Sequence, residues 1–282
     1  MKYTYKASIV FLFTSIFLYS IPSLAADDRS LTQISGDLYR FKNNFHYSVV
    51  LVTSEGVIVT DPINKEAAQW LKDEIAERFN KPIKYLILSH DHADHSAGGE
   101  VFDAPIVVAH TNAKADIIGE KRPTAVPNIT FSDRMTIELG GKTVELSYLG
   151  LSHSDNMVVM NFPEQRVLFA VDFIPIKSLP WKTLTDSYIP EWIDAVKKVE
   201  AMDFDILMPG HGKPGNKADV TALREFMEEL YAAVLSGLRE GQSLEQLKQN
   251  ISLSKYASWQ NYDTQLAQNI EGIYNQIKLH RR

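Results

Sequence analysis

The sequence contains no cysteine in its 282 residues. This absence excludes disulfide bonds, thiolate metal ligands and the lipid-carrying cysteine of a bacterial lipoprotein. Basic residues are also in the minority, because 29 Lys and Arg stand against 35 Asp and Glu and give a formal net charge of −6. Nucleic-acid binding depends on basic surfaces, so the composition argues against nucleic acid as a partner.

Residues 1–25 have the pattern of a secretory signal peptide. Lys2 and Lys6 precede an almost wholly apolar run at residues 9–21, and Ser-Leu-Ala at 23–25 fits a cleavage site. The apolar run is shorter than the roughly 20 residues that a membrane-spanning helix needs, although an uncleaved anchor is the alternative. We therefore expect cleavage, no stable membrane anchor afterwards, and a soluble protein that is secreted or, most simply, exported to a bacterial periplasm.

The densest group of metal-ligating side chains lies between a strand-like run at residues 83–88 and the glycine pair 98–99. It consists of His90, His92, Asp94 and His95. On a helix these four positions would point around most of the cylinder. In an extended chain His90 and His92 project to the same side, so they could bind one metal ion while a turn near Ala93 aims Asp94 and His95 at a second. The alternative interpretation is a polar surface loop.

The rest of the chain alternates short β-like and helix-like segments, as in an α/β protein. We expect strands at 37–41, 47–53, 56–60, 83–88, 106–109, 135–139, 143–148, 157–162, 166–171 and 206–208. We expect helices at 65–79, 111–120, 190–199, 218–238, 243–250 and 262–279. After the signal peptide, the predicted organisation is one α/β domain at 26–215 and a C-terminal helical extension at 216–282 that packs on it.

The motif His-x-His-x-Asp-His resembles the signature of the metallo-β-lactamase superfamily. The resemblance requires further ligands downstream in a fixed order, and the sequence supplies candidates for them. They are His153 in GLSHSDN, Asp172 after VLFAV and His211 in PGHG, while Asp61 after VIVT matches an early aspartate of the same pattern. The resemblance implies a four-layer αββα sandwich of the metallo-β-lactamase type, here with the helical extension added.

The resemblance also implies the role of each candidate ligand. The first metal ion would be held by His90, His92 and His153, the second by Asp94, His95 and His211, and Asp172 would bridge the two. This donor set implies two Zn²⁺ per chain, although it also admits Fe or Mn. In the implied mechanism a metal-bridging hydroxide attacks a carbonyl group of a small-molecule substrate. Asp94 would be catalytic, because it could orient the hydroxide and pass a proton to the leaving group.

The resemblance leaves the substrate class open. A bridging aspartate at Asp172 resembles glyoxalase II, lactonases and related hydrolases, which favours esters, thioesters or lactones. The best-known β-lactamase subclasses need a cysteine ligand at that position, and the histidine-only subclass usually lacks the bridging carboxylate. Hydrolysis of β-lactam antibiotics is therefore the alternative activity. A non-catalytic metal-binding protein on the same fold is the alternative of another class.

Several other residues have two interpretations each. His46 could line the entrance of the site on a mobile hairpin, but the favoured interpretation is an ordinary loop histidine, and His110 is expected to be structural. Asp61 is expected to brace the metal loop from outside the ligand set rather than to bind metal. The segment 173–188 lies between two ligands and should overhang the site. Its candidate substrate contacts, which could equally be packed or solvated side chains, are Lys177, Trp181, Lys182 and Tyr188. Phe45 and Tyr47 are similar candidates. The sequence does not give the oligomeric state.

Overall fold

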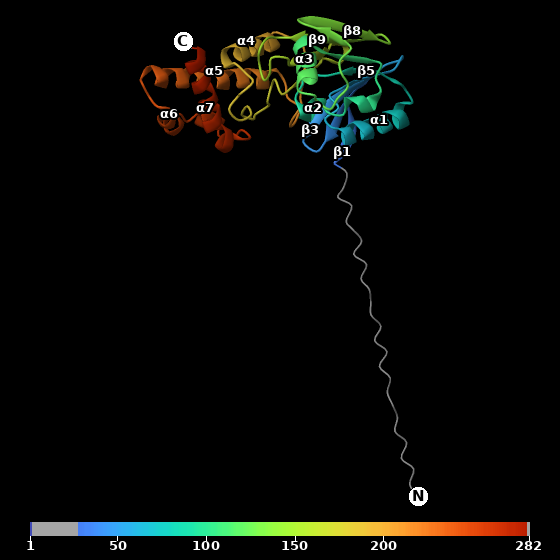
Figure 1. Ribbon diagram of the computed structural model, residues 1–282, viewed down its shortest axis with the longest axis horizontal. Coiled ribbons are helices and arrows are strands. Elements are labelled where there is room, and N and C mark those ends of the chain that lie inside the picture. Colours follow the sequence, from blue (N-terminus) through green and yellow to red (C-terminus); the bar gives the residue numbers. More distant parts are fainter. Residues whose placement is uncertain (2–27, 281–282) are drawn as a thin grey trace.

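The computed structural model describes residues 1 and 28–280 (Figure 1). Apart from Met1, the predicted signal peptide lies outside the described residues. Among the helices that are described, none has the length and apolar content needed to cross a membrane.

The first half of the chain forms a seven-stranded sheet in the order β1-β2-β3-β4-β5-β6-β7. Its strands are β1 (Arg29–Ser35), β2 (Leu38–Asn43), β3 (His46–Val52), β4 (Val57–Thr60), β5 (Ile83–Ile87), β6 (Ile106–His110) and β7 (Ile129–Phe131). The pairs from β1 to β4 are antiparallel and those from β4 to β7 are parallel. The parallel part brings the carboxyl ends of β4, β5 and β6 to one edge, where loops can combine into a site.

The second half forms a five-stranded sheet in the order β12-β11-β10-β9-β8. Its strands are β8 (Arg134–Leu139), β9 (Lys142–Tyr148), β10 (Val158–Phe162), β11 (Val167–Val171) and β12 (Ile206–Pro209). The strands β8 and β9 form one antiparallel hairpin and β10 and β11 a second, and Gly140 and Gly141 have φ values of 54° and 75° in the first turn. A tight hairpin turn of this kind needs positive φ values at both central residues, and glycine adopts them without steric cost.

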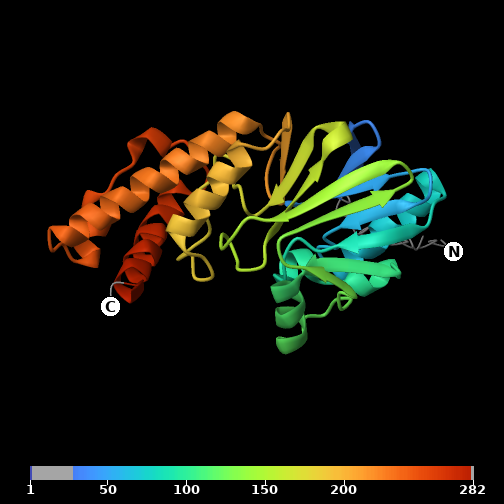
Figure 2. The same cartoon turned by 90° about the horizontal axis from the view of Figure 1, so that it is seen from above.

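Helices flank the pair of sheets (Figure 2). On the first sheet these are α1 (Lys65–Phe79) and α3 (Thr111–Gly119), whose buried residues share a core cluster with β3, β4, β5 and β6. On the side of the second sheet, α4 (Ile189–Glu200), α5 (Lys217–Arg239), α6 (Leu244–Asn250) and α7 (Tyr262–His280) have buried residues in the same core cluster as the strands of that sheet. The predicted four-layer αββα sandwich with a C-terminal helical extension is therefore confirmed.

Strand β3 illustrates how the sequence separates the two cores. Val49 and Leu51 belong to the cluster between the sheets, whereas Val50 belongs to the cluster under α1. Successive side chains of a strand point to opposite faces, so a continuous apolar run is what a strand buried on both faces requires. Full burial of each such side chain contributes about 1.5–3 kcal/mol.

The predicted elements were largely found, with differences at the edges. Helix α1 spans the predicted residues because Asn64 caps its first turn and Asn80, with φ 49°, ends it. The edge strands β1 and β7 were not predicted. The turn expected near Ala93 is a single helical turn, α2 (Ala93–Ser96). The domain boundary at 215/216 stays a prediction, although α5 does begin at Lys217.

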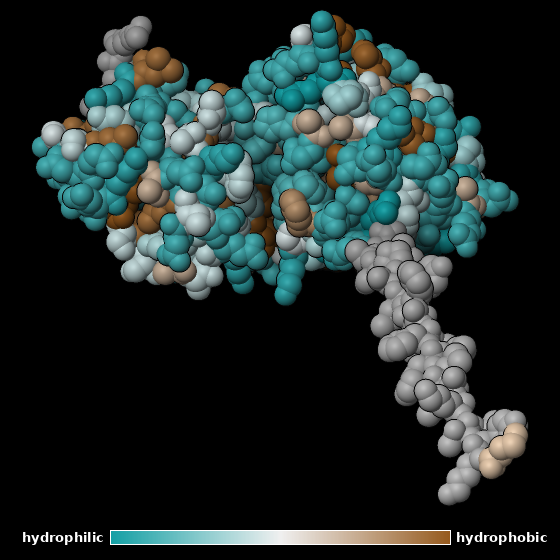
Figure 3. Space-filling view, turned by 60° about the horizontal axis from the view of Figure 1, so that its bottom comes forward, coloured by the Kyte–Doolittle hydropathy of each residue, from teal (hydrophilic) through white to brown (hydrophobic). Residues whose placement is uncertain are grey.

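The outer surface is predominantly polar. On the face in Figure 3, hydrophilic residues cover most of both the sandwich and the helical extension, and apolar residues appear in small separate patches. The expectation that nucleic acid is not a partner stays a prediction from the net charge of −6.

Candidate metal centre

The candidate ligands come together where strands of both sheets end. The segment His90–His95 follows β5, His153 lies in the loop between β9 and β10, and Asp172 and His211 follow β11 and β12. Apolar strands fix the backbone of each segment, and the polar side chains stand in the loops just beyond them. This arrangement places ligands from distant parts of the sequence on a rigid base.

The first cluster consists of His90, His92 and His153, whose ligand atoms all lie within 4.8 Å of one another. His153 Nε2 is 3.0 Å from His92 Nδ1. Burial lowers the pKa of His90 well below its usual value and also lowers that of His153. Both rings are therefore neutral at neutral pH, which is the form in which imidazole binds a metal ion.

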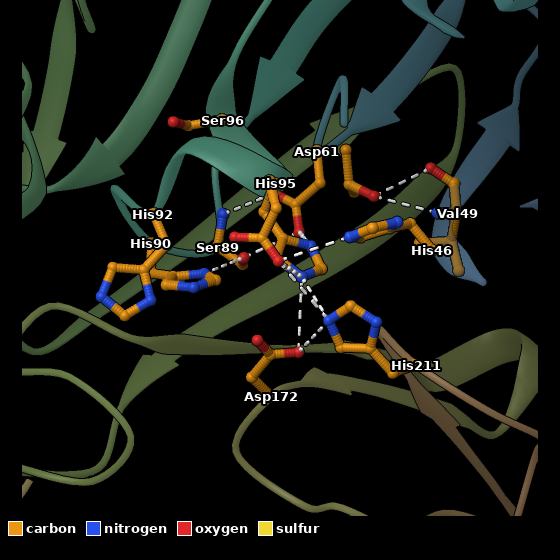
Figure 4. Close-up of polar contacts among 12 residues, drawn as sticks. His46, Val49, Asp61, Ser89, His90, His92, His95, Ser96, Asp172 and His211 are labelled. Carbon is orange, nitrogen blue, oxygen red and sulfur yellow. Dashed lines mark hydrogen bonds and ion pairs between the residues drawn. The ribbon is translucent and has the colours of Figure 1, made fainter. Parts of the chain in front are cut away.

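The second cluster consists of Asp94, His95, Asp172 and His211, again with ligand atoms within 4.8 Å of one another. Asp172 Oδ1 lies 3.4 Å from His95 Nε2 and 3.3 Å from His211 Nε2 (Figure 4). Its other oxygen, Oδ2, lies 3.6 Å from His153 Nε2 in the first cluster. One carboxylate thus faces both clusters, as expected for a bridging ligand.

The pairing of carboxylates and imidazoles sets the charges of the second cluster. Burial would raise the pKa of Asp172, but the positive charge on His95 and hydrogen bonds from His211 and His95 hold it well below its usual range. For His95 and His211 burial has the opposite effect and would lower the pKa. The negative charge and hydrogen bonding of Asp172 outweigh it, so the pKa of both rings is raised. The protons on these rings compete with a metal ion for the same nitrogen atoms, so metal binding here releases protons.

The polar atoms of the site fit metal ions. His90 Nε2 is buried and forms no hydrogen bond with any residue that the structure describes. Buried polar atoms are nearly always satisfied, so such an atom indicates a missing partner. Imidazole nitrogen and carboxylate oxygen atoms suit Zn²⁺, Fe or Mn, and each cluster supplies at least three of them.

Outer contacts orient three of the ligand histidines through the ring nitrogen that faces away from the cluster. His90 Nδ1 lies 2.9 Å from Ser89 Oγ, and His211 Nδ1 lies 3.3 Å from the carbonyl oxygen of Phe45. His95 Nδ1 lies 3.6 Å from Asp61 Oδ2. Such partners fix the tautomer and the orientation of a metal-binding ring.

Asp61 braces the metal loop, as the sequence predicted. Its carboxylate accepts hydrogen bonds from the backbone N–H of Ser89 at 2.8 Å and from Ser89 Oγ at 2.7 Å. Both residues are fully buried. Asp61 therefore ties the end of β4 to the residue immediately before the first ligand.

The backbone around Asp172 is strained and closely packed. Val171 has φ 40°, which is rare for a β-branched residue, and its carbonyl oxygen accepts a hydrogen bond from Gly210 N at 3.0 Å. A Cβ atom on Gly210 would lie 2.7 Å from His95 Cε1 and 3.0 Å from Asp172 Oδ1. Only glycine lets the two ligand-bearing segments approach this closely.

The structure corrects the interpretation of His46 as an ordinary loop histidine. His46 Nε2 lies 3.4 Å from Asp94 Oδ2, and its side chain is mostly buried against the second cluster (Figure 4). The hairpin that carries it is held by a hydrogen bond from Tyr47 N to Gly210 O at 2.8 Å. No local signal in the sequence could reveal this, because the contact depends on how the hairpin docks on the loop after β12.

His110 is structural, as predicted. It is buried, caps α3 by accepting a hydrogen bond from Asn112 N, and stacks on Tyr148 with ring centroids 4.2 Å apart. Phe45, in contrast, is 68 % exposed and lies beside His46 and His211 at the rim of the site.

The segment 173–188 reaches the site through a residue that the sequence did not single out. Asp186 Oδ2 lies 3.7 Å from His92 Nε2. The four predicted candidates have other contacts. Lys177 faces Asp219 at 3.8 Å, Lys182 lies over the exposed ring of Trp181, and Tyr188 packs against His280. Whether any of the four contacts substrate stays a prediction.

Comparisons with known proteins agree on the family. A family model described as the metallo-beta-lactamase superfamily matches residues 42–211. The chain is 24% identical to the 2,4-dinitroanisole O-demethylase subunit alpha of Nocardioides sp. (strain JS1661), over 74% of this chain and 65% of that protein. It is 25% identical to a metallo-beta-lactamase type 2 of Bacillus sp. (strain 170), over 60% of this chain and 67% of that one. The chain thus spans about two thirds of the length of these relatives.

Solved structures share the fold. A metallo-beta-lactamase from Pontibacter korlensis superimposes with a TM-score of 0.63 at 22% identity, covering 71% of this chain and 99% of that one. The DIM-1 metallo-beta-lactamase gives a TM-score of 0.63 at 18% identity, covering 72% and 98%.

The family match covers more than half of the chain and includes every candidate ligand from His90 to His211. It confirms the resemblance on which the predicted class, a metal-dependent hydrolase, was based. The chain belongs to the metallo-beta-lactamase superfamily.

Proposed function

We propose that the protein is an exported dinuclear zinc hydrolase in which a hydroxide attacks the carbonyl carbon of a small ester, thioester or lactone and the acyl C–O or C–S bond to the leaving group breaks. The observation that carries the proposal is the position of Asp172, whose two oxygen atoms face different histidine clusters. A carboxylate in this position suits a pair of metal ions, because it can bind one with each oxygen atom. Export rests on the signal-like pattern of residues 1–25.

The candidate ligands would hold two metal ions in separate sites. When bound, a pair of metal ions makes a water molecule nucleophilic at neutral pH and polarises a carbonyl oxygen atom. His90, His92 and His153 would hold one ion, Asp94, His95 and His211 the other, and Asp172 would contribute an oxygen atom to each.

Asp94 is the residue best placed to move a proton. Burial would raise its pKa, but a hydrogen bond from His46 and the positive charge on His95 lower it to about 2. Asp94 is therefore a carboxylate at neutral pH, half-exposed and able to accept a proton at Oδ2 from an attacking water molecule. It can then deliver the proton to the oxygen or sulfur atom of the leaving group. His46 Nε2 keeps the carboxylate aimed during this transfer.

This proton path favours ester-like substrates over β-lactams. An alkoxide or thiolate leaving group needs less protonation than an amine, so a single carboxylate of low pKa suffices for it. The absence of cysteine from the sequence supports the same ordering, since the best-known β-lactamase subclasses of this family use a cysteine ligand at the position of Asp172.

Hydrolysis of β-lactam antibiotics remains the second candidate, because a metallo-beta-lactamase type 2 is among the relatives. Another relative is named as a subunit of an aryl ether demethylase, so the family members similar to this chain do not agree on a substrate. A non-catalytic metal-binding protein on this fold is the alternative of another class.

Turnover of a lactone, an aryl thioester and a cephalosporin on one zinc-loaded sample separates these possibilities. We expect kcat/KM for the lactone or the thioester to exceed that for the cephalosporin, with a metal-depleted sample as the control. If the cephalosporin is preferred by more than tenfold, about 1.4 kcal/mol of transition-state stabilisation, the β-lactamase alternative replaces the proposal. Metal-dependent turnover of any of the three rejects the non-catalytic alternative.

A further inference from the structure

His92 differs from the other oriented ligands in where its outer partner comes from. Its Nδ1 lies 3.0 Å from His153 Nε2, so this nitrogen atom faces the first cluster. Its Nε2 faces away and lies 3.7 Å from Asp186 Oδ2. The outer partners of His90, His95 and His211 come from the first sheet and its loops, whereas Asp186 lies in the connector between β11 and α4, defined here as residues 173–188.

The connector has a strained backbone. Lys177, Lys182 and Leu184 have φ values of 47°, 51° and 56°, a left-handed conformation that only a few per cent of non-glycine residues adopt. Each such residue is energetically unfavourable and persists only where the surrounding structure fixes it. Something outside the connector must therefore supply the restraint.

Helix α7 supplies that restraint through side-chain amides. Asn269 Nδ2 donates hydrogen bonds to the carbonyl oxygens of Pro180 at 2.9 Å and Lys182 at 2.7 Å. Gln276 Nε2 donates to the carbonyl oxygens of Leu184 at 3.0 Å and Ser187 at 2.9 Å. These bonds hold the connector on both sides of Asp186.

Two more residues of α7 complete the contact. The side-chain oxygen of Gln265 accepts a hydrogen bond from Lys182 N at 2.8 Å. At Gly272 the connector approaches so closely that a Cβ atom would lie 2.1 Å from the carbonyl oxygen of Thr183. Positions 265, 269, 272 and 276 follow one another at intervals of four, three and four, so they form one stripe along the helix. We call this set the α7 stripe.

We propose that the α7 stripe sets the affinity of the first metal site by holding Asp186 against His92. The carboxylate of Asp186 favours a proton on His92 Nε2, which leaves the lone pair of Nδ1 free for the cation and fixes the plane of the ring. Asp186 is thus a positioning residue, and the C-terminal helical extension is part of the site. This inference rests on the proposed function, because it assumes that His90, His92 and His153 bind a metal ion.

The first test replaces Asp186 in the full chain. Asp186→Ala should weaken zinc binding at one of the two sites by about tenfold, the lower end of the usual cost of removing such a partner. Asp186→Asn should lose less, because its amide oxygen keeps a partial negative charge that can face His92 Nε2. Asp263→Ala, an exposed aspartate on α7, is the charge control. Zinc affinity is measured by competition with a chromophoric chelator, and the absorption spectrum of the Co²⁺ form reports the ligand geometry.

The second test weakens the α7 stripe itself. Asn269→Ala combined with Gln276→Ala should weaken the same site and change the Co²⁺ spectrum in the same way as Asp186→Ala. Asn275→Ala, at an exposed position between the two, is the control. Because all these changes act through one contact, adding Asp186→Ala to the stripe variant should produce little further loss. Fully additive losses would overturn the proposed route.

The outcomes also separate this inference from the proposed function. If the wild-type protein binds two zinc ions and Asp186→Ala binds them with unchanged affinity, the inference is wrong and the proposed function stands. If the wild-type protein folds but binds no metal ion, both fail.

Discussion

Replacing Asp172 with alanine is expected to reduce kcat by more than about a hundredfold. Removing an outer partner of a metal ligand usually costs 10–100-fold, and a residue that contacts both clusters should cost more. Metal content should fall from about two ions per chain toward one, because His95 and His211 lose the carboxylate that lies 3.3–3.4 Å from them. Turnover and metal content are measured on the same preparation, so that the two losses can be compared directly.

Asp172→Asn is the matched variant for this prediction. It keeps the shape of the side chain but removes the charge, so it should retain folding while losing most of the second-site affinity. Unfolding midpoints of both variants show whether the fold survives. An Asp172→Ala protein that keeps two bound ions and wild-type turnover would contradict the bridging role.

Gly210→Ala is expected to disrupt the site from the backbone side. The added methyl group would lie 2.7 Å from His95 Cε1, 2.8 Å from Val171 Cγ1 and 3.0 Å from Asp172 Oδ1. Overpacking of this kind costs about 1–3 kcal/mol, and here two of the three atoms that must move belong to candidate ligands. We expect a lower free energy of unfolding in urea and a loss of bound metal in the same variant.

Gly119→Ala is the control for the glycine substitution. Gly119 is the last residue of α3, and a Cβ atom there would meet no atom within 4 Å. Alanine is preferred to glycine in helices by about 1 kcal/mol, so this variant should be as stable as the wild type or more stable. If Gly210→Ala behaves like Gly119→Ala in both stability and metal content, the close approach at Gly210 has no functional importance.

The positions of His90, Asp172 and His211 could be predicted because each stands just beyond a short strand, β5, β11 or β12, whose apolar residues are readable in the sequence. The roles of the candidate ligands came from the resemblance to the family and stay a prediction. The division of His90 and His92 from Asp94 and His95 could also be predicted, since it follows from the change of backbone direction at Ala93. Edge strand β1 was not predicted, because its largely exposed and polar sequence lacks the apolar residues that indicate a strand.

Apart from that of Asp61, the outer contacts of the site could not be predicted from local patterns. His46 reaches Asp94 only because its hairpin docks on Gly210, and Asp186 faces His92 only because α7 holds the connector. In the sequence, Gln265 and Asn269 look like residues of a solvent-facing helix surface. The structure buries both, because their amides bind the connector backbone rather than water.

Zinc titration of metal-depleted protein tests the central claim most directly. With the preferred ester, thioester or lactone as substrate, turnover should be absent before zinc is added and should reach its plateau at about two ions per chain. The protein should be folded throughout, as judged by circular dichroism. A folded protein that binds no zinc, or one whose turnover does not change as zinc is added, would contradict the assignment as a dinuclear metal-dependent hydrolase.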